Sequence, residues 1–122
     1  MRFLTTRTHG VFDYVFGALL IASPWLLDFA FDGPETWVPV FTGVFVIGYS
    51  LFTDYELGIG RSMSMPTHLW MDGLAGIVLA TSPILFGFAQ VVWIPHLALG
   101  ITAVAGALTT SLRPARKFWP AR

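Results

Sequence analysis

The sequence predicts an all-α fold, an integral membrane four-helix bundle built from two tandem helical-hairpin repeats. Three observations lead to this expectation. Hydrophobic residues make up 55% of the 122 residues and charged residues only 11%, whereas a soluble domain carries about 25% charged residues to cover its surface. Four apolar stretches have the length of a membrane span, and the first half of the chain recurs in the second. The mean hydropathy of +0.68 also indicates a surface that faces lipid.

Each apolar stretch is close to the length of about 20 residues that a helix needs to cross a bilayer. The stretches cover residues 10–31, 37–53, 69–92 and 94–112. A chain in lipid must satisfy its own backbone hydrogen bonds, so we expect each stretch to be a helix.

The repeat becomes visible when the chain is shifted by 59 positions, the separation of Thr8 and Thr67. Further coinciding pairs are His9 with His68, Asp13 with Asp72, Gly17 with Gly76, Ser23 with Ser82 and Pro24 with Pro83. Each copy holds two spans, so both copies enter the membrane from the same side, and we expect a pseudo-two-fold axis along the membrane normal. The predicted organisation is a single transmembrane domain over residues 1–122, with repeats at about 8–57 and 67–112 and a basic tail at 113–122.

With four spans, every basic residue falls on one side of the membrane. These residues are Arg2, Arg7, Arg61, Arg113, Arg116, Lys117 and Arg122. The turns on the other side carry only acidic charges, at Asp28, Asp32 and Glu35. Because positive charge stays in the cytoplasm, we expect a multi-pass protein with cytoplasmic N- and C-termini. Its main partner is then the lipid bilayer, and no dense basic run indicates nucleic acid.

A tripeptide inside the first span points to a family. Residues 23–25 read Ser-Pro-Trp, and residues 82–84 of the second copy read Ser-Pro-Ile. A Ser-Pro-Trp sequence placed in a tandem two-span repeat resembles the SPW-repeat family of small bacterial membrane proteins. The resemblance covers about residues 8–112 and implies a bacterial inner-membrane protein with two hairpin repeats. It implies no activity and supplies no catalytic residue.

The pattern Thr-His-x3-Asp-x3-Gly occurs twice, beginning at Thr8 and at Thr67. Residues four apart lie on one helix face. The two resulting stripes are His9, Asp13 and Gly17, and His68, Asp72 and Gly76. An aspartate at this depth in lipid must face protein or water, and a glycine allows another helix to approach closely. We therefore expect the first and third helices to meet across the axis, bringing two His–Asp pairs together near the inner surface.

Two interpretations of these pairs stay open. In the structural one, Thr8 and Thr67 are helix N-caps, the aspartates are favoured by the nearby helix N-termini, and no cofactor is bound. In the functional one, the pairs form a proton or ion path, or a site for zinc or another divalent ion. The ligands of such a metal site would be His9, Asp13, His68 and Asp72. A bis-His haem site is the least favoured version.

The two Ser-Pro pairs, at Ser23-Pro24 and Ser82-Pro83, are placed in the outer half of the first and third helices. Proline removes an intrahelical hydrogen bond and kinks a helix, and the serine hydroxyl can bond to the preceding turn. Such kinks either improve packing or open an outward-facing vestibule. His96, near the start of the fourth helix, has no equivalent in the first copy and is expected to be a solvated cap.

The leading functional hypothesis is a non-enzymatic structural or accessory membrane protein that packs with itself, as a homodimer, or with a membrane partner. The alternative is a small proton or metal-cation transporter or channel that uses the paired His-x3-Asp motifs. An enzyme is not expected. The sequence contains no cysteine and no evident nucleophile–base set or nucleotide motif, and its loops are too short to build a soluble active site.

Overall fold

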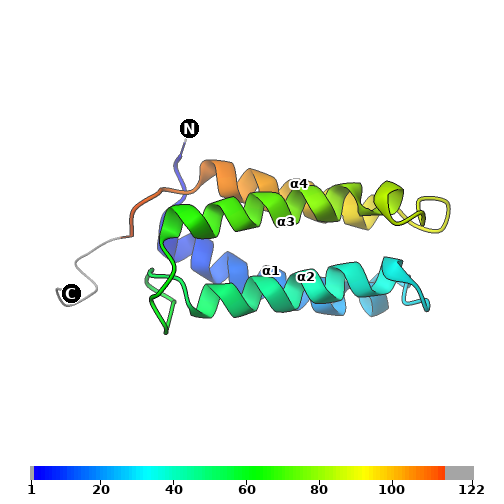
Figure 1. The fold of residues 1–122 in the computed structure, drawn as a ribbon, viewed down its shortest axis with the longest axis horizontal. Coiled ribbons are helices and arrows are strands. Elements are labelled where there is room, and N and C mark those ends of the chain that lie inside the picture. The colour runs from blue at the N-terminus through cyan, green and yellow to red at the C-terminus, as the bar shows by residue number, and fades with distance from the viewer. Residues whose placement is uncertain (1, 115–122) are drawn as a thin grey trace.

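The computed structural model describes residues 2–114, and these residues form four helices and no strand (Figure 1). The helices are α1 (Thr6–Leu26), α2 (Pro34–Leu51), α3 (Met65–Leu85) and α4 (Ile94–Thr109). The all-helical, four-helix prediction is therefore confirmed for this part of the chain. Most of the predicted basic tail, residues 115–122, lies outside the described residues.

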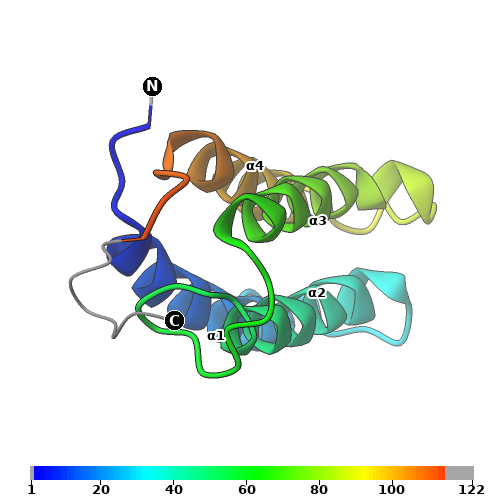
Figure 2. The same ribbon diagram turned by 60° about the vertical axis from the view of Figure 1, so that its left-hand side comes forward.

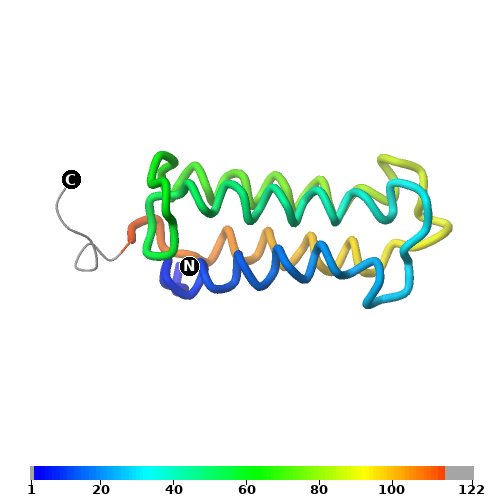
Figure 3. The backbone as a smooth tube through the Cα atoms, turned by 90° about the horizontal axis from the view of Figure 1, so that it is seen from below, coloured from blue at the N-terminus to red at the C-terminus, as the bar shows by residue number. Residues whose placement is uncertain are grey.

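The helices form two hairpins, α1 with α2 and α3 with α4, that lie side by side (Figures 1 and 2). The helices of each hairpin pack along their length, and α2 also contacts α3 of the other hairpin. The short turns after α1 and α3 lie at one end of the bundle, here called the turn end. The start of α1, the α2–α3 connection and the end of α4 lie at the opposite end, here called the terminal end (Figure 3).

Helices α1 and α3 begin in the same way at equivalent positions of the repeat. The hydroxyl of Thr5 accepts a hydrogen bond from the backbone N–H of Thr8 (3.1 Å), and that of Ser64 accepts one from Thr67 (3.3 Å). These contacts satisfy N–H groups that the start of a helix leaves without a partner. The N-caps are thus Thr5 and Ser64. The prediction of Thr8 and Thr67 as caps was wrong, because both already lie in the first helical turn and donate to the caps.

The Ser-Pro pairs lie in the last turns of α1 and α3, not further inside. The hydroxyls of Ser23 and Ser82 donate to carbonyl oxygens three residues earlier, at 2.9 and 2.6 Å, as expected. Pro24 and Pro83 stand two residues before the helices end. Almost no helix follows either proline, so a kink there could redirect only the last residues of α1 and α3. The kinks and the vestibule stay predictions. The first and third spans, predicted over residues 10–31 and 69–92, were placed too far along the chain at both ends, since the helices are Thr6–Leu26 and Met65–Leu85 and the last apolar residues lie in the turns.

Gly17 and Gly76 pack closely against other helices, but within their own hairpins. A Cβ atom on Gly17 would lie 3.2 Å from the carbonyl oxygen of Gly43 on α2. A Cβ atom on Gly76 would lie 2.7 Å from the carbonyl oxygen of Gly100 on α4. The expectation that these glycines bring the first and third helices together was wrong, because the glycine contacts join α1 to α2 and α3 to α4.

Two short backbone bridges relate the hairpins to each other at the terminal end. Leu4, just before α1, pairs with Thr110 after α4, and Met63, just before α3, pairs with Thr53 after α2. Each bridge includes backbone hydrogen bonds of 2.7–2.9 Å. The start of each hairpin is thus tied to the end of the other, which is the relation that a pseudo-two-fold axis produces. The bridges also hold Thr53 and Thr110 beside the starts of α3 and α1.

The middle of the bundle is filled by a small apolar cluster around the fully buried side chains of Leu20 and Leu79. Large apolar side chains also cover the outside, and many of them are exposed on every helix. Within the described residues, one helix, α3, is both long and apolar enough to cross a membrane by these two criteria, while α4 is apolar but shorter, at 16 residues.

Candidate functional site

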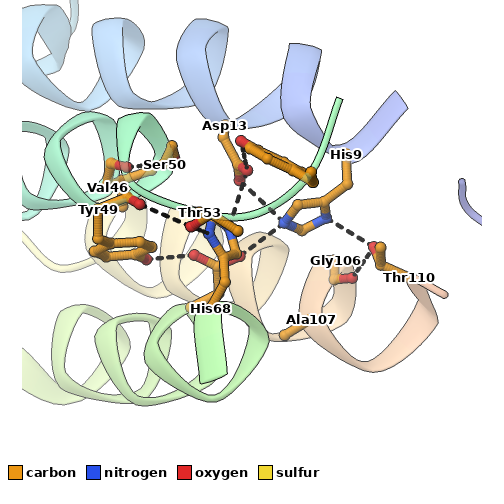
Figure 4. A network of polar contacts seen from close by, with 12 residues as sticks. His9, Asp13, Val46, Tyr49, Ser50, Thr53, His68, Gly106, Ala107 and Thr110 are labelled. Atoms are coloured by element: carbon orange, nitrogen blue, oxygen red, sulfur yellow. Dashed lines mark hydrogen bonds and ion pairs between the residues drawn. The ribbon is translucent and has the colours of Figure 1, made fainter. Parts of the chain in front are cut away.

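Four buried side chains of α1 and α3 meet near the terminal end of the bundle (Figure 4). They are His9, Asp13, His68 and Asp72, here called the His–Asp centre. The Nε2 atom of His9 lies 2.7 Å from Asp72 Oδ2 and 3.0 Å from Asp13 Oδ1. The Nε2 atom of His68 lies 3.0 Å from Asp13 Oδ2 and 3.2 Å from Asp72 Oδ2. Each histidine therefore contacts both carboxylates, one on its own helix and one on the other hairpin.

The local sequence explains this arrangement. Histidine and aspartate four residues apart project from the same helix face, and the equivalent N-caps start α1 and α3 at equivalent positions of the repeat. The two faces therefore meet with matching residues opposite each other. The four residues are only 0–5% exposed, so the centre is shielded from solvent.

Each imidazole ring also contacts a threonine, through the ring nitrogen that faces away from the aspartates. The Nδ1 atoms of His9 and His68 lie 2.7 Å from the hydroxyl oxygens of Thr110 and Thr53, respectively. Each threonine hydroxyl donates its one hydrogen to the backbone carbonyl four residues earlier, at 2.6 Å for Thr110 and 2.7 Å for Thr53. The hydroxyl oxygen can then only accept from the ring, so Nδ1 is the donor in both histidines. A neutral ring of this tautomer directs the lone pair of Nε2 into the His–Asp centre.

Two tyrosine hydroxyls donate to the carboxylates. Tyr49 donates to Oδ1 of Asp72, and Tyr55 donates to Oδ2 of Asp13 at 2.9 Å. Burial, together with the charge of Asp13, raises the pKa of Tyr55, so its hydroxyl keeps the proton that it donates. The two-fold relation breaks at this point. Gly106 occupies the position of α4 that corresponds to Tyr49 of α2, since both backbone carbonyls accept from the threonine four residues later.

Two ionised carboxylates in a dry interior need compensating positive charge, because a buried charge without a partner costs several kcal/mol. Neutral imidazoles that present lone pairs to the carboxylates provide none. Protons on both Nε2 atoms, or one divalent cation among the four side chains, would make the His–Asp centre neutral. In either state the centre joins the two hairpins.

A void of about 10 Å³ lies between the His–Asp centre and the middle of the bundle. It is lined by both aspartates and by apolar side chains from all four helices. A space of this size corresponds to about one water molecule. Beyond it, Leu20 and Leu79 fill the interior.

The family model described as the SPW repeat domain matches residues 7–110, which include both hairpins and the whole His–Asp centre. The chain belongs to the SPW repeat family. The resemblance noted at residues 23–25 is thereby confirmed. No curated protein and no solved structure matches the chain.

The structure of this SPW repeat protein brings together all four His and Asp residues that the sequence singled out. It leaves the other predicted positions outside the site. Gly17 and Gly76 face the partner helix of their own hairpin. The Ser-Pro pairs lie at the turn end, where the helices finish.

Four residues that support the His–Asp centre were missed by the sequence analysis. They are Tyr49, Thr53, Tyr55 and Thr110. A signal for the two threonines existed, because each follows the second helix of its own repeat at a matching position. No repeat signal exists for the tyrosines, since Gly106 replaces Tyr49 and Tyr55 lies in the single connection between the hairpins.

His96 was predicted to be a solvated cap, and this was wrong, because the side chain is 1% exposed. Its ring packs against the rings of Phe29 and Phe88, with centroids 4.9 and 4.8 Å away. Its Nε2 atom donates to the backbone carbonyl of Glu35 at 2.8 Å. His96 is therefore a further contact between the hairpins, at the turn end.

Proposed function

We propose that this SPW repeat protein is a multi-pass, non-enzymatic structural or accessory component of the bacterial cytoplasmic membrane. The observation that carries the proposal is the distribution of polarity. At the terminal end the ionisable and hydroxyl groups of the His–Asp centre are enclosed, while large apolar side chains point outward on all four helices. This distribution is favourable in lipid, whereas in water it would expose large apolar side chains to solvent.

Exposed large apolar side chains occur on all four helices. One example from each helix, in chain order, is Val15, Phe45, Ile77 and Ile101, with 55%, 68%, 53% and 56% of the side chain exposed. A soluble monomer rarely leaves large contiguous apolar patches open to water. Four short helices also leave most of this surface uncovered by protein. Lipid, and a second copy or another membrane protein, are therefore the expected partners.

The charges at the two ends support one orientation. The basic residues of the described part lie at the terminal end, and they are Arg2, Arg7, Arg61 and Arg113. The turn end carries the acidic residues Asp28, Asp32 and Glu35. By the positive-inside rule, the terminal end and both chain termini are cytoplasmic.

Fractionation and topology mapping test this proposal. We expect the chain to stay with membranes through an alkaline wash and to require detergent for extraction. A cytoplasmically active reporter should work after Arg122, and an externally active reporter should work in the turn before α2. A monomer recovered without detergent would overturn the membrane assignment, and exchanged reporter activities would overturn the orientation.

A second candidate function is transport of protons or metal cations, favoured by ionisable side chains buried between membrane helices. Flux would be measured in liposomes that contain the purified protein. Transport through the His–Asp centre requires flux that disappears in the double variant Asp13→Asn with Asp72→Asn. Equal flux in that variant would exclude the carboxylates, and no flux in the wild type would leave only the structural role.

A further inference from the structure

We propose that the His–Asp centre binds one divalent transition-metal ion, zinc above all, and that this ion joins the two hairpins. The ligands are the two Nε2 atoms and one oxygen of each carboxylate. This inference goes beyond the proposed membrane role, and it holds whether or not the ion is moved across the membrane.

The first argument is the geometry of the ligand set. The four candidate ligand atoms lie within 4.8 Å of one another. A tetrahedral zinc site with bonds of about 2.0–2.1 Å separates neighbouring ligand atoms by about 3.3 Å. Three of the distances between ligand atoms, from His9 Nε2 to Asp72 Oδ2 (2.7 Å) and Asp13 Oδ1 (3.0 Å) and from His68 Nε2 to Asp72 Oδ2 (3.2 Å), are slightly shorter than this. A small outward movement of the side chains therefore admits the ion without rearranging the helices.

The second argument is the position of a buried nitrogen. The Nε2 atom of His68 is buried and makes no hydrogen bond in the described structure, although two carboxylate oxygens lie 3.0 and 3.2 Å away. The ring cannot turn to improve this, because Nδ1 is held by Thr53. With the proton on Nδ1, the lone pair of Nε2 in a neutral ring points at the carboxylates. A metal ion at the centre would use this lone pair as a ligand.

The third argument is the support behind the ligands. A metal-bound histidine almost always donates its other ring N–H, and metal-bound carboxylates are hydrogen-bonded in turn. Here both Nδ1 atoms donate to threonines, and each aspartate accepts from a tyrosine. Because the tyrosines occupy Oδ2 of Asp13 and Oδ1 of Asp72, the oxygens left for the ion are Oδ1 of Asp13 and Oδ2 of Asp72.

The chemistry of the ligands selects the kind of ion. Two imidazoles and two carboxylates suit zinc and its neighbours among the divalent transition metals. Calcium takes six to eight oxygen ligands and magnesium an octahedral set rich in water, so neither fits an enclosed four-ligand site. A dication also cancels the two carboxylate charges. Since four protein ligands complete a tetrahedron, the site holds an ion and offers no open position for catalysis.

The test uses the full chain purified in detergent, stripped with a chelator, loaded with zinc and desalted. We expect elemental analysis to find one zinc per chain. Loading with Co²⁺ instead should give the intense visible absorption of a tetrahedral ion. Octahedral Co²⁺, or a wild type that retains no zinc, would overturn the proposal, since the latter is the outcome expected if protons alone neutralise the centre.

Variants assign the ion to these ligands. The double variant Asp13→Asn with Asp72→Asn keeps the shape of the side chains and should lose the zinc and the Co²⁺ absorption. The control His96→Gln removes a buried histidine at the other end of the bundle and should retain both. Helix content by circular dichroism and the elution volume in detergent show that each variant is folded. Equal zinc in the double variant and the wild type would overturn the assignment.

If the double variant does not fold, the wild type alone decides the question. Chelation should then lower the melting temperature of the wild type, and added zinc should restore it. An unchanged melting temperature would overturn the role of the ion in joining the hairpins. Neither result bears on the membrane role, because fractionation and topology are measured separately.

Discussion

The first hairpin and the second supply the His–Asp centre with equivalent ligands, but they support those ligands differently. His9 rests on Thr110 in the same way that His68 rests on Thr53, with the same 2.7 Å separation. The carboxylates lack this symmetry. Both tyrosines that donate to them come from α2 and the connection that follows it, whereas the second hairpin has Gly106 in place of Tyr49.

The difference has a topological reason. The connection between the hairpins, residues 52–64, exists once in the chain, so Tyr55 has no equivalent on the other side of the axis. The histidines and aspartates of the centre lie in segments that occur in both repeats. Of the two tyrosines that donate to the aspartates, Tyr55 lies in a segment that occurs only once. Substitutions at equivalent positions of the two hairpins should therefore have equal effects on stability where the surroundings are equivalent, and unequal effects where they differ.

The largest effect is expected from Asp13→Ala and Asp72→Ala, made separately. Either change leaves the remaining buried charges unbalanced, and breaking a buried ion pair costs about 3–5 kcal/mol. Unfolding followed by circular dichroism in detergent would measure the loss of unfolding free energy. We expect the two variants to be similarly destabilised. A carboxylate whose removal changes nothing would show that the two halves of the centre are not equivalent.

Substitution of the two equivalent glycines should reduce the unfolding free energy by unequal amounts. A Cβ atom on Gly76 meets the backbone oxygen of Gly100 at 2.7 Å, whereas one on Gly17 first meets the side chain of Ile47, at 2.6 Å. A side chain can shift and a backbone carbonyl cannot do so easily, so Gly76→Ala should cost about 3 kcal/mol and Gly17→Ala clearly less. The same unfolding measurement compares them. A greater loss for Gly17→Ala would contradict the difference in packing.

Substitution of the two equivalent threonines should lower the melting temperature by equal amounts. Thr53→Val and Thr110→Val keep the shape of the side chain and leave an Nδ1–H group buried without an acceptor, which costs about 1–3 kcal/mol. Melting temperatures of the two variants should fall by similar amounts. Thr81→Val is the matched control, because the Thr81 hydroxyl also bonds to a helix carbonyl but is exposed. A similar fall in the control would mean that the histidines are not involved.

The smallest effect is expected where the chain leaves α1 and α3. Asp28 (φ 60°) and Gly87 (φ 75°) occupy equivalent left-handed positions. A side chain in this conformation costs about 1–2 kcal/mol, less for aspartate, and glycine adopts it freely. Asp28→Gly should therefore raise the melting temperature slightly, and Gly87→Ala should lower it. Changes of the same sign in both would show that the two turns are not equivalent.

Much of the fold could be predicted because its signals are local. A shift of 59 positions shows the repeat, and the four-residue spacing of His9 and Asp13 places both on one helix face whatever surrounds the helix. The same reasoning predicted that two such faces meet. Helix ends were less predictable, since an apolar composition does not distinguish the last helical turn from an apolar connection such as residues 27–31.

By itself, the sequence determined four helices, two equivalent hairpins and the residues of the His–Asp centre, because periodicity and repetition are properties of neighbouring residues. Tertiary structure alone decided that Gly17 faces α2, that His96 is buried and that Thr110 holds His9. The contact between Thr110 and His9 joins residues 101 positions apart, and that between Tyr55 and Asp13 joins residues 42 positions apart. Such pairings depend on how the packed helices enclose polar atoms. The residues that neighbour each partner in the sequence do not indicate which distant residue it will contact.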